Sequence, residues 1–178
     1  AFLRNSRIGN PQKAGPINAN RPKQRKVTLR PCTVLRFSAY EATGKRPMTD
    51  GTLPRIAVCL AAYNGVRYLR QQLDSIFAQH GVDVTVFASV DQSTDGTVQW
   101  LLAYQERQPH ITILPYGERY GGAAQNFFRL IRDVNFEGFE YVAFADQDDI
   151  WLPNKLIRAV SCMTERNTQG YSSDVIAF

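Results

Sequence analysis

The feature that most constrains the fold is an alternation of short apolar runs with segments of helical period, which begins abruptly at residue 54. The apolar runs are rich in Val, Ile, Ala and Phe and suit buried strands. Between them, apolar side chains recur at helical spacing, as in Leu69, Leu73 and Ile76. This alternation is typical of an α/β domain with a Rossmann-like, mostly parallel sheet and flanking helices. The expected strands are residues 56–60, 84–90, 111–114, 141–145 and 174–178.

Four helices are expected between these strands. The first ends near Gly81, and the second begins near Val98 and stops before Pro109. The third follows Gly121, and the fourth begins near Pro153, a residue suited to a first helical turn. The apolar face expected for the third helix consists of Phe127, Leu130, Ile131 and Val134.

The first 53 residues differ from the rest in charge and in their pattern of apolar residues. They contain 11 Lys and Arg against two acidic residues, five prolines, and one short apolar patch at 34–37. We therefore predict a disordered basic tail or leader at 1–53 and a single domain at 54–178. The chain carries a net charge of +5, but residues 54–178 alone are net negative. No nucleic-acid partner is expected, because the tail also lacks the interleaved aromatic residues that stack on bases.

The sequence contains neither an apolar stretch long enough to cross a bilayer nor a recognisable secretory signal. Cys32, Cys59 and Cys162 lie far apart, without the paired spacing of zinc or redox sites. Cys59 and Cys162 are expected to be small buried side chains and not nucleophiles. We expect a cytoplasmic protein that contacts the inner face of the membrane peripherally at most. Because the last expected strand has no continuation, we also predict that the domain is truncated at its C-terminus.

Three polar clusters follow three of the expected strands. Residues 62–65 come after the first strand, residues 91–97 after the second, and residues 146–149 after the fourth. The carboxyl ends of parallel strands meet at one edge of a sheet, which is where open α/β sheets bind ligands. The three clusters therefore predict one site.

The last cluster places the carboxylates of Asp146, Asp148 and Asp149 within four residues. A cation would relieve their mutual repulsion. Because every candidate ligand is an oxygen, Mg²⁺ or Mn²⁺ is favoured over zinc, and the few protein ligands leave positions for substrate phosphates. The alternative is a short acidic turn that only caps the next helix.

The other two clusters are weaker signals. Asp91 ends the second expected strand, where its carboxylate could accept a hydrogen bond from a nucleobase imide or a ribose hydroxyl. One of residues 93–95 is expected to be the N-cap of the following helix. Tyr63 and Asn64 could line the base of a nucleotide, or could form an ordinary turn.

Four motifs carry a family resemblance. They are AAYNG at 61–65, SVDQSTDGT at 89–97, Gly121-x4-Asn126-Phe127, and ADQDDIW at 145–151 followed by Lys155-Leu156. In order and spacing they resemble the N-terminal half of glycosyltransferase family 2, and in particular a bacterial rhamnosyltransferase-like branch that builds surface polysaccharide. The resemblance covers about residues 54–178. It implies a GT-A fold, a nucleotide-diphosphate sugar donor, and Mn²⁺ or Mg²⁺ bound by a D-x-D pair.

The resemblance also implies roles for individual residues. The chain departs from the family at Val90, where many members have a second Asp, and at Gln92, where Gly is common. These departures leave the nucleotide base open and do not affect the metal motif. Carried over position by position, the nucleotide-binding residues are Ala62, Tyr63, Asn64, Asp91 and Asp146, and the metal ligands are Asp146 and Asp148.

The implied reaction is sugar transfer, with inversion, to a saccharide or lipid-linked saccharide acceptor. The general base of that reaction is expected downstream of residue 178, so no catalytic residue is assigned and the isolated chain is expected to be inactive or nearly so. Two alternatives remain, a non-catalytic nucleotide-binding remnant and a nucleotidyltransferase. The second would need a Gly-rich and basic phosphate loop, which residues 61–65 do not provide. Nucleic-acid binding by the tail, a weaker third idea, predicts affinity that falls steeply with salt.

Overall fold

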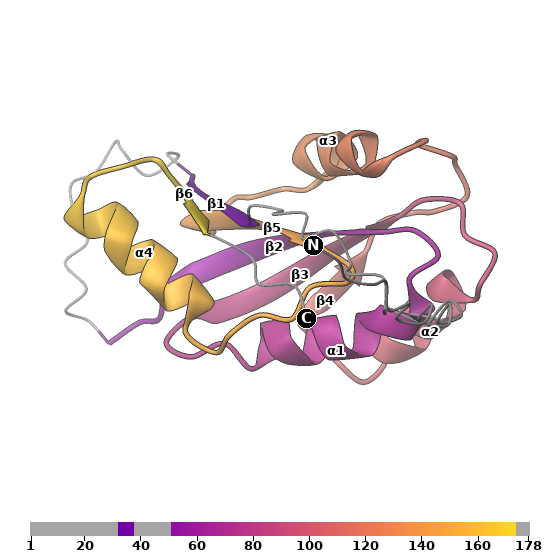
Figure 1. The fold of residues 1–178 in the computed structure, drawn as a ribbon, viewed down its shortest axis with the longest axis horizontal. Helices are drawn as coiled ribbons and strands as arrows, with labels where there is room; N and C mark the ends of the chain where they lie inside the picture. The colour runs from indigo at the N-terminus through magenta and orange to yellow at the C-terminus, as the bar shows by residue number, and fades with distance from the viewer. Residues whose placement is uncertain (1–31, 38–50, 174–178) are drawn as a thin grey trace, which may run out of the picture.

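The structure is a computed structural model that describes residues 32–37 and 51–173. Within these residues, six strands form one sheet in the order β4-β3-β2-β5-β1-β6, with helices on both faces (Figure 1). The strands are β1 (Cys32–Arg36), β2 (Arg55–Ala62), β3 (Asp83–Val90), β4 (Ile111–Ile113), β5 (Tyr141–Asp146) and β6 (Gly170–Ser173). The helices are α1 (Val66–Phe77), α2 (Thr97–Gln105), α3 (Ala123–Asp133) and α4 (Lys155–Glu165).

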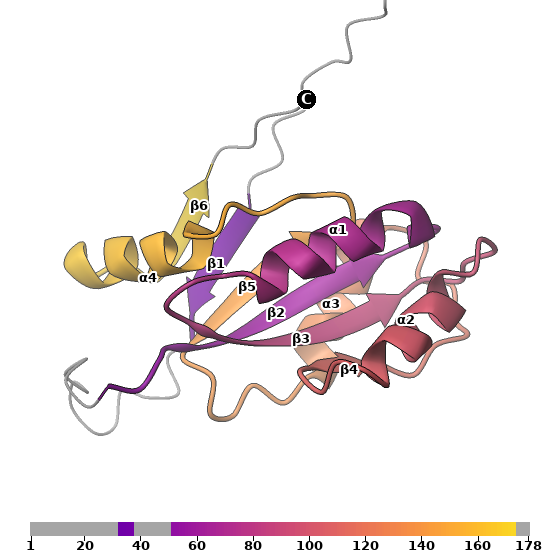
Figure 2. The same ribbon diagram turned by 90° about the horizontal axis from the view of Figure 1, so that it is seen from below.

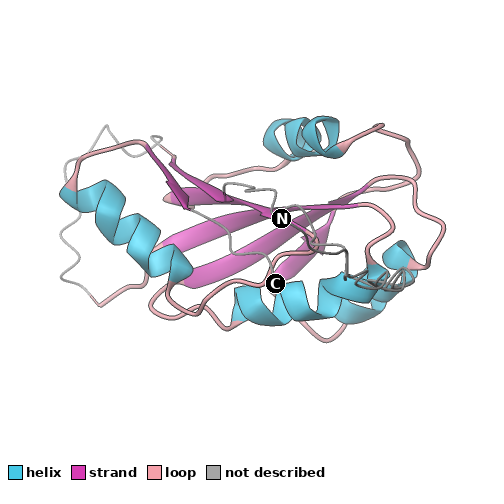
Figure 3. Ribbon diagram, in the orientation of Figure 1, coloured by secondary structure: helices cyan, strands magenta, loops and turns pink. Residues whose placement is uncertain are grey.

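The molecule has three layers (Figure 3). Helices α1, α2 and α4 cover one face of the sheet, and α3 lies on the opposite face, behind the strands in Figure 2. Strand β2 shows the corresponding pattern, because its side chains alternate between two hydrophobic clusters. Ile56, Val58 and Leu60 belong to the cluster that includes residues of α1, α2 and α4. Ala57 and Cys59 belong to the cluster beneath α3. The mostly parallel α/β fold predicted from the sequence is confirmed.

The connections place the ligand-binding edge of the sheet. Strands β2, β3, β4 and β5 are parallel, with Ala62 opposite Val90 and Ala61 opposite Asp146. The chain passes outward from β2 through β3 to β4, and then returns to the other side of β2 as β5. The strand order therefore reverses at β2. Open α/β sheets bind ligands at the carboxyl ends of strands beside such a reversal.

Strand β1 corrects the predicted domain boundary. Residues 32–36, assigned to a disordered tail, pair antiparallel with β5 on one side and with β6 on the other. Val34 is 1% exposed and belongs to the core. Five residues amid a polar stretch show no periodicity, and their pairing partners lie more than 100 positions along the chain, so the sequence did not reveal this strand. Residues 1–31 and 38–50 of the predicted tail, and the strand expected at 174–178, lie outside the described residues; β6 precedes the position of that strand.

The face that α3 turns toward the sheet also differs from the prediction. Leu130 and Val134 are buried as expected, but Ile131 is 50% exposed. Two polar residues, Asn126 and Arg129, are buried in its place. Their side chains hydrogen-bond to Ala62 of β2, to Ser89 of β3 and to Pro115 in the loop before α3. A search for apolar periodicity cannot find buried polar residues of this kind. Among the described residues, no helix is long and apolar enough to cross a bilayer.

Cys59 provides a test of the buried sheet. Burial raises the pKa of its thiol to about 12, so the reactive thiolate is scarce at pH 8. We expect a variant in which Cys32 and Cys162 are serine to resist a thiol-specific chromogenic reagent until urea unfolds it. A variant that keeps only the partly exposed Cys162 is the control and should react in the native state. Rapid native labelling of Cys59 would contradict the burial of β2.

Candidate nucleotide-binding site

A pocket of about 340 Å³ lies at the carboxyl ends of β2, β3 and β5. Five of the six residues predicted to bind nucleotide or metal line it: Ala62, Tyr63, Asp91, Asp146 and Asp148. The polar clusters that follow three separate strands therefore meet in one place, as the sheet topology predicts. The remaining lining residues are Ala61, Arg119, Gly121, Gly122, Ala123, Asn126 and Gln147.

Asn64, the sixth predicted residue, is outside this lining. Its backbone has a φ of 44°, in the left-handed region, and its side-chain Oδ1 accepts a hydrogen bond of 2.8 Å from the N–H of Thr94. In return, the hydroxyl oxygen of Ser93 accepts from the N–H of Asn64 at 3.0 Å. Asn64 thus fastens the first polar cluster to the second.

The turn that follows β3 braces the first loop and does not cap helix α2 in the way predicted. The N-cap of α2 is Gly96, with φ 88°, and none of residues 93–95. Asp95 accepts from the N–H groups of Thr97, at the start of α2, and of Val66, at the start of α1. The Thr97 hydroxyl oxygen accepts from the N–H of Gly65 at 2.8 Å. One turn therefore aligns the beginnings of two helices.

Asp91 is 5% exposed and is held by backbone donors. Its Oδ1 accepts from the N–H groups of Gln92 and Tyr120, both at 2.8 Å, and its Oδ2 accepts from the N–H of Gly121 at 3.0 Å. Burial acts to raise the pKa of Asp91, but these hydrogen bonds and the charge of Arg119 outweigh it and lower the pKa below its ordinary value. A carboxylate has about four acceptor directions, so one remains for a ligand.

Helix α3 begins at the pocket, which its N-cap Gly122 and its first residue Ala123 line. Asn126 ties it to the sheet, because its side-chain N–H₂ donates to the carbonyl oxygens of Ser89, at 3.0 Å, and Ala62, at 3.4 Å. Arg129 donates to the Ser89 hydroxyl and to the carbonyl of Pro115. These contacts hold the loop that supplies Arg119 to the pocket. Arg119 itself carries no motif signal in the sequence, whereas the glycine pair at 121–122 does.

The carboxylates of the D-x-D motif occupy different environments. Asp146 ends β5 and is half-buried, whereas Asp148 is exposed; both line the pocket. Asp149 is not among the lining residues. Across residues 32–37 and 51–173, no group of three or more His, Cys, Asp or Glu side chains is arranged to hold a metal. The two lining aspartates nevertheless offer hard oxygen ligands, which suit Mg²⁺ or Mn²⁺.

The segment after these carboxylates is docked on α1. The Ser75 hydroxyl oxygen accepts from the N–H of Trp151 at 3.0 Å. The buried side chain of Gln79 accepts from the N–H of Leu156 and donates to the carbonyl of Leu152. These side chains hold the segment between β5 and α4 in one conformation.

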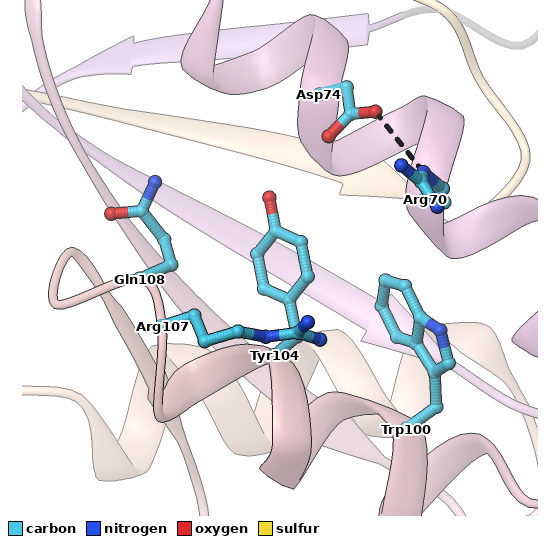
Figure 4. A pocket seen from close by; sticks show the side chains of 6 residues that line it. All are labelled: Arg70, Asp74, Trp100, Tyr104, Arg107 and Gln108. Atoms are coloured by element: carbon cyan, nitrogen blue, oxygen red, sulfur yellow. Dashed lines mark ion pairs between the residues drawn. The ribbon is translucent and has the colours of Figure 1, made fainter.

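A second pocket, of about 250 Å³, lies between α1 and α2, away from the strand ends (Figure 4). Trp100 and Tyr104 stack there with ring centroids 5.1 Å apart. The exposed ion pair of Arg70 and Asp74, at 3.8 Å, forms the other side. This groove contains none of the residues that the sequence motifs single out.

Comparison with known proteins agrees with this geometry. Residues 57–177 match the sequence profile of Glycosyl transferase family 2. The chain belongs to this family. Among family 2 relatives, the dTDP-rhamnosyl transferase RfbG of Shigella flexneri is 44% identical over 120 residues, which are 67% of this chain and 42% of that protein. The predicted family is therefore confirmed.

Solved structures of glycosyltransferases share the fold. The mannosyltransferase PcManGT from Pyrobaculum calidifontis, in complex with GDP-Man and Mn²⁺, has a TM-score of 0.54 and 25% identity, over 63% of this chain and 33% of that one. Residues 1–349 of S. aureus TarS give a TM-score of 0.55 and 22% identity, over 64% of this chain and 33% of that one. The chain thus spans less than half the length of these proteins and of RfbG.

Proposed function

We propose that this chain is the donor-binding part of a glycosyltransferase that uses a nucleotide-diphosphate sugar and a divalent cation. The observation that carries the proposal is the meeting of Asp91, Asp146 and Asp148 in one pocket at the reversal of the strand order. One end of a nucleoside diphosphate, the nucleobase, needs a hydrogen-bond acceptor. The other end, the diphosphate, needs a cation held by a pair of carboxylates. Membership of family 2 supports the same assignment.

Each end of the donor has named residues. Asp91 offers its remaining acceptor direction to an imide N–H of the base, and Tyr63, which is 55% exposed, also lines the pocket. Asp146 and Asp148 would hold Mn²⁺ or Mg²⁺, whose coordination the diphosphate oxygens would complete. When bound, the ion supplies positive charge to the departing diphosphate. The guanidinium of Arg119 adds a second positive charge at the pocket wall.

The acceptor that Asp91 offers in this pocket supports a pyrimidine as the donor base. Uracil and thymine both carry an imide N–H, and RfbG, by its name, uses a dTDP donor. We therefore propose a thymidine or uridine diphosphate sugar, with rhamnose as the leading sugar. A saccharide or lipid-linked saccharide acceptor and an inverting transfer complete the proposal.

Calorimetric titration of the chain with dTDP, UDP and GDP tests this function. With Mn²⁺ present, we expect dTDP or UDP to bind and GDP to bind more weakly, because the guanine edge offers Asp91 different donor positions. Chelation of Mn²⁺ should weaken the binding of the nucleoside diphosphate about tenfold or more. The loss of groups that support a metal site lowers affinity or activity by factors of this order. A chain that binds no nucleoside diphosphate with Mn²⁺ would rule the proposed function out.

A further inference from the structure

We propose that Gln147, the residue between the two aspartates of the D-x-D motif, is a positioning residue that locks the base loop, residues 62–65, to the metal-ligating carboxylates. The inference rests on the proposed function, because it concerns how the same pocket holds both ends of one donor. Gln147 would act through Tyr63 and its two aspartate neighbours without itself ligating the cation.

The first observation is a two-point hydrogen bond. The side-chain oxygen Oε1 of Gln147 accepts from the N–H of Tyr63 at 2.8 Å, and its Nε2 donates to the carbonyl of the same residue at 2.9 Å. The carboxamide thus satisfies both backbone groups of Tyr63, as a neighbouring strand would. Strands β2 and β5 are already paired up to Ala61 and Asp146. Gln147 extends that connection past the ends of the strands and into the pocket.

The second observation comes from Gly65, at the other end of the base loop. A Cβ atom on Gly65 would lie 2.1 Å from Oε1 of Gln147 and 2.5 Å from its Cδ. The φ of Gly65 is −114°, a conformation open to any residue. The absence of a side chain at position 65 therefore leaves the space that the Gln147 carboxamide occupies, and a methyl group there would have to displace that carboxamide. Two positions far apart in the sequence serve one contact.

The chemistry of the contact selects glutamine. A glutamate at 147 would keep the acceptor for the Tyr63 N–H, lose the donor to the carbonyl, and add a third negative charge beside Asp146 and Asp148. Asparagine has the same two groups but is one methylene shorter. Neither replacement can restore both hydrogen bonds with the backbone in place.

The consequence concerns ligands that touch both loops. A nucleoside diphosphate with its cation contacts the base loop at one end and the carboxylates at the other. With the two loops locked, both contacts form without a further loss of loop freedom. Without the hydrogen bonds between Gln147 and Tyr63, the cation still binds its aspartates, but the position of the base loop is no longer coupled to that of the bound cation. The gain in nucleotide affinity that Mn²⁺ provides should therefore fall.

A double-mutant cycle tests the inference. In titrations with dTDP, or with UDP if UDP binds more tightly, we expect Gln147→Ala to reduce the Mn²⁺-dependent gain in affinity about tenfold, as losses of second-sphere partners do. Gly65→Ala should reduce it similarly, because the new methyl displaces the carboxamide. In the Gln147→Ala background, Gly65→Ala should have little further effect, since the space is then vacant.

The controls separate this result from other failures. Gln71→Ala removes an exposed glutamine on α1 and should leave the gain unchanged. Urea unfolding of every variant shows whether it folds, and Gln147→Glu and Gln147→Asn report the same contact if one alanine variant does not. The inference would be overturned if Mn²⁺ raised nucleotide affinity equally in the wild type and in Gln147→Ala. It would also be overturned if the effects of Gln147→Ala and Gly65→Ala were additive. If the wild type itself shows no Mn²⁺-dependent binding, the proposed function fails instead.

Discussion

Replacing Asp148 by alanine is expected to abolish the increase in nucleotide diphosphate affinity that Mn²⁺ provides. Asp148 is exposed and lines the pocket, so its removal takes away a carboxylate ligand without opening a cavity in the core. With Asp146 left as the only lining member of the D-x-D pair, we expect the Mn²⁺-dependent gain to fall about 10- to 100-fold, to near none. Titration of dTDP and UDP, each with Mn²⁺ and with chelator, measures this change.

The matched control is Asp74→Ala, which removes another exposed carboxylate from α1, where its partner is Arg70. It changes the net charge by the same amount, so any long-range electrostatic effect is shared by both variants. If Mn²⁺ raises the nucleotide affinity of the Asp148→Ala variant as much as that of the wild type, this aspartate is not a metal ligand.

Asp91→Asn is expected to lower the free energy of unfolding at pH 7 by about 2–3 kcal/mol, because charged hydrogen-bond acceptors are lost and a buried donor is left unpaired. Three backbone N–H groups point at the wild-type carboxylate. Asparagine has one acceptor oxygen, so in either orientation its NH₂ group faces at least one of these donors. The loop that leads into α3 is thereby loosened. Urea unfolding measures the difference.

The same substitution has a predictable pH dependence. The pKa of Asp91 is lowered in the folded state, so its charge stabilises the fold above the unfolded value, about pH 4. This stabilisation is lost as the pH falls through the lower, folded-state pKa. The wild type should therefore exceed Asp91→Asn in stability most clearly between pH 5 and 7, and the gap should close under more acidic conditions. Parallel stability curves for the two proteins would contradict the assignment.

The sequence anticipated the parts of the fold that have strong local signals. Apolar runs of buried parallel strands and the helical spacing of residues such as Leu69 and Leu73 placed β2, β3, β5 and α1 correctly. The pocket could be predicted as well, because strand-end motifs converge once the sheet is parallel. Asp91, Asp146 and Asp148 were identified on that basis.

What the sequence could not supply depends on contacts between distant segments. Asn64 was a candidate either for lining the base or for an ordinary turn, and the sequence did not show that its side-chain oxygen accepts from the N–H of Thr94, 30 positions away. Gln147 received no role from the sequence, yet its side chain hydrogen-bonds to Tyr63, 84 positions earlier. Ile131 follows helical periodicity but lies on the outward side of α3, because Asn126 and Arg129 occupy the inward side. In each case the partner exists only in the folded chain.

Strand β1 has a practical consequence for where this domain is taken to begin. The family match starts at residue 57, and the alternation of apolar runs with segments of helical period starts at residue 54. A protein cut at either position would lose the strand that separates β5 from β6. The backbone N–H and C=O groups of Tyr141, Val142 and Ala143 in β5, which now pair with β1, would face solvent as an open edge that can recruit a strand from another molecule. Self-association, and not the loss of any motif residue, would then limit work with the shortened domain.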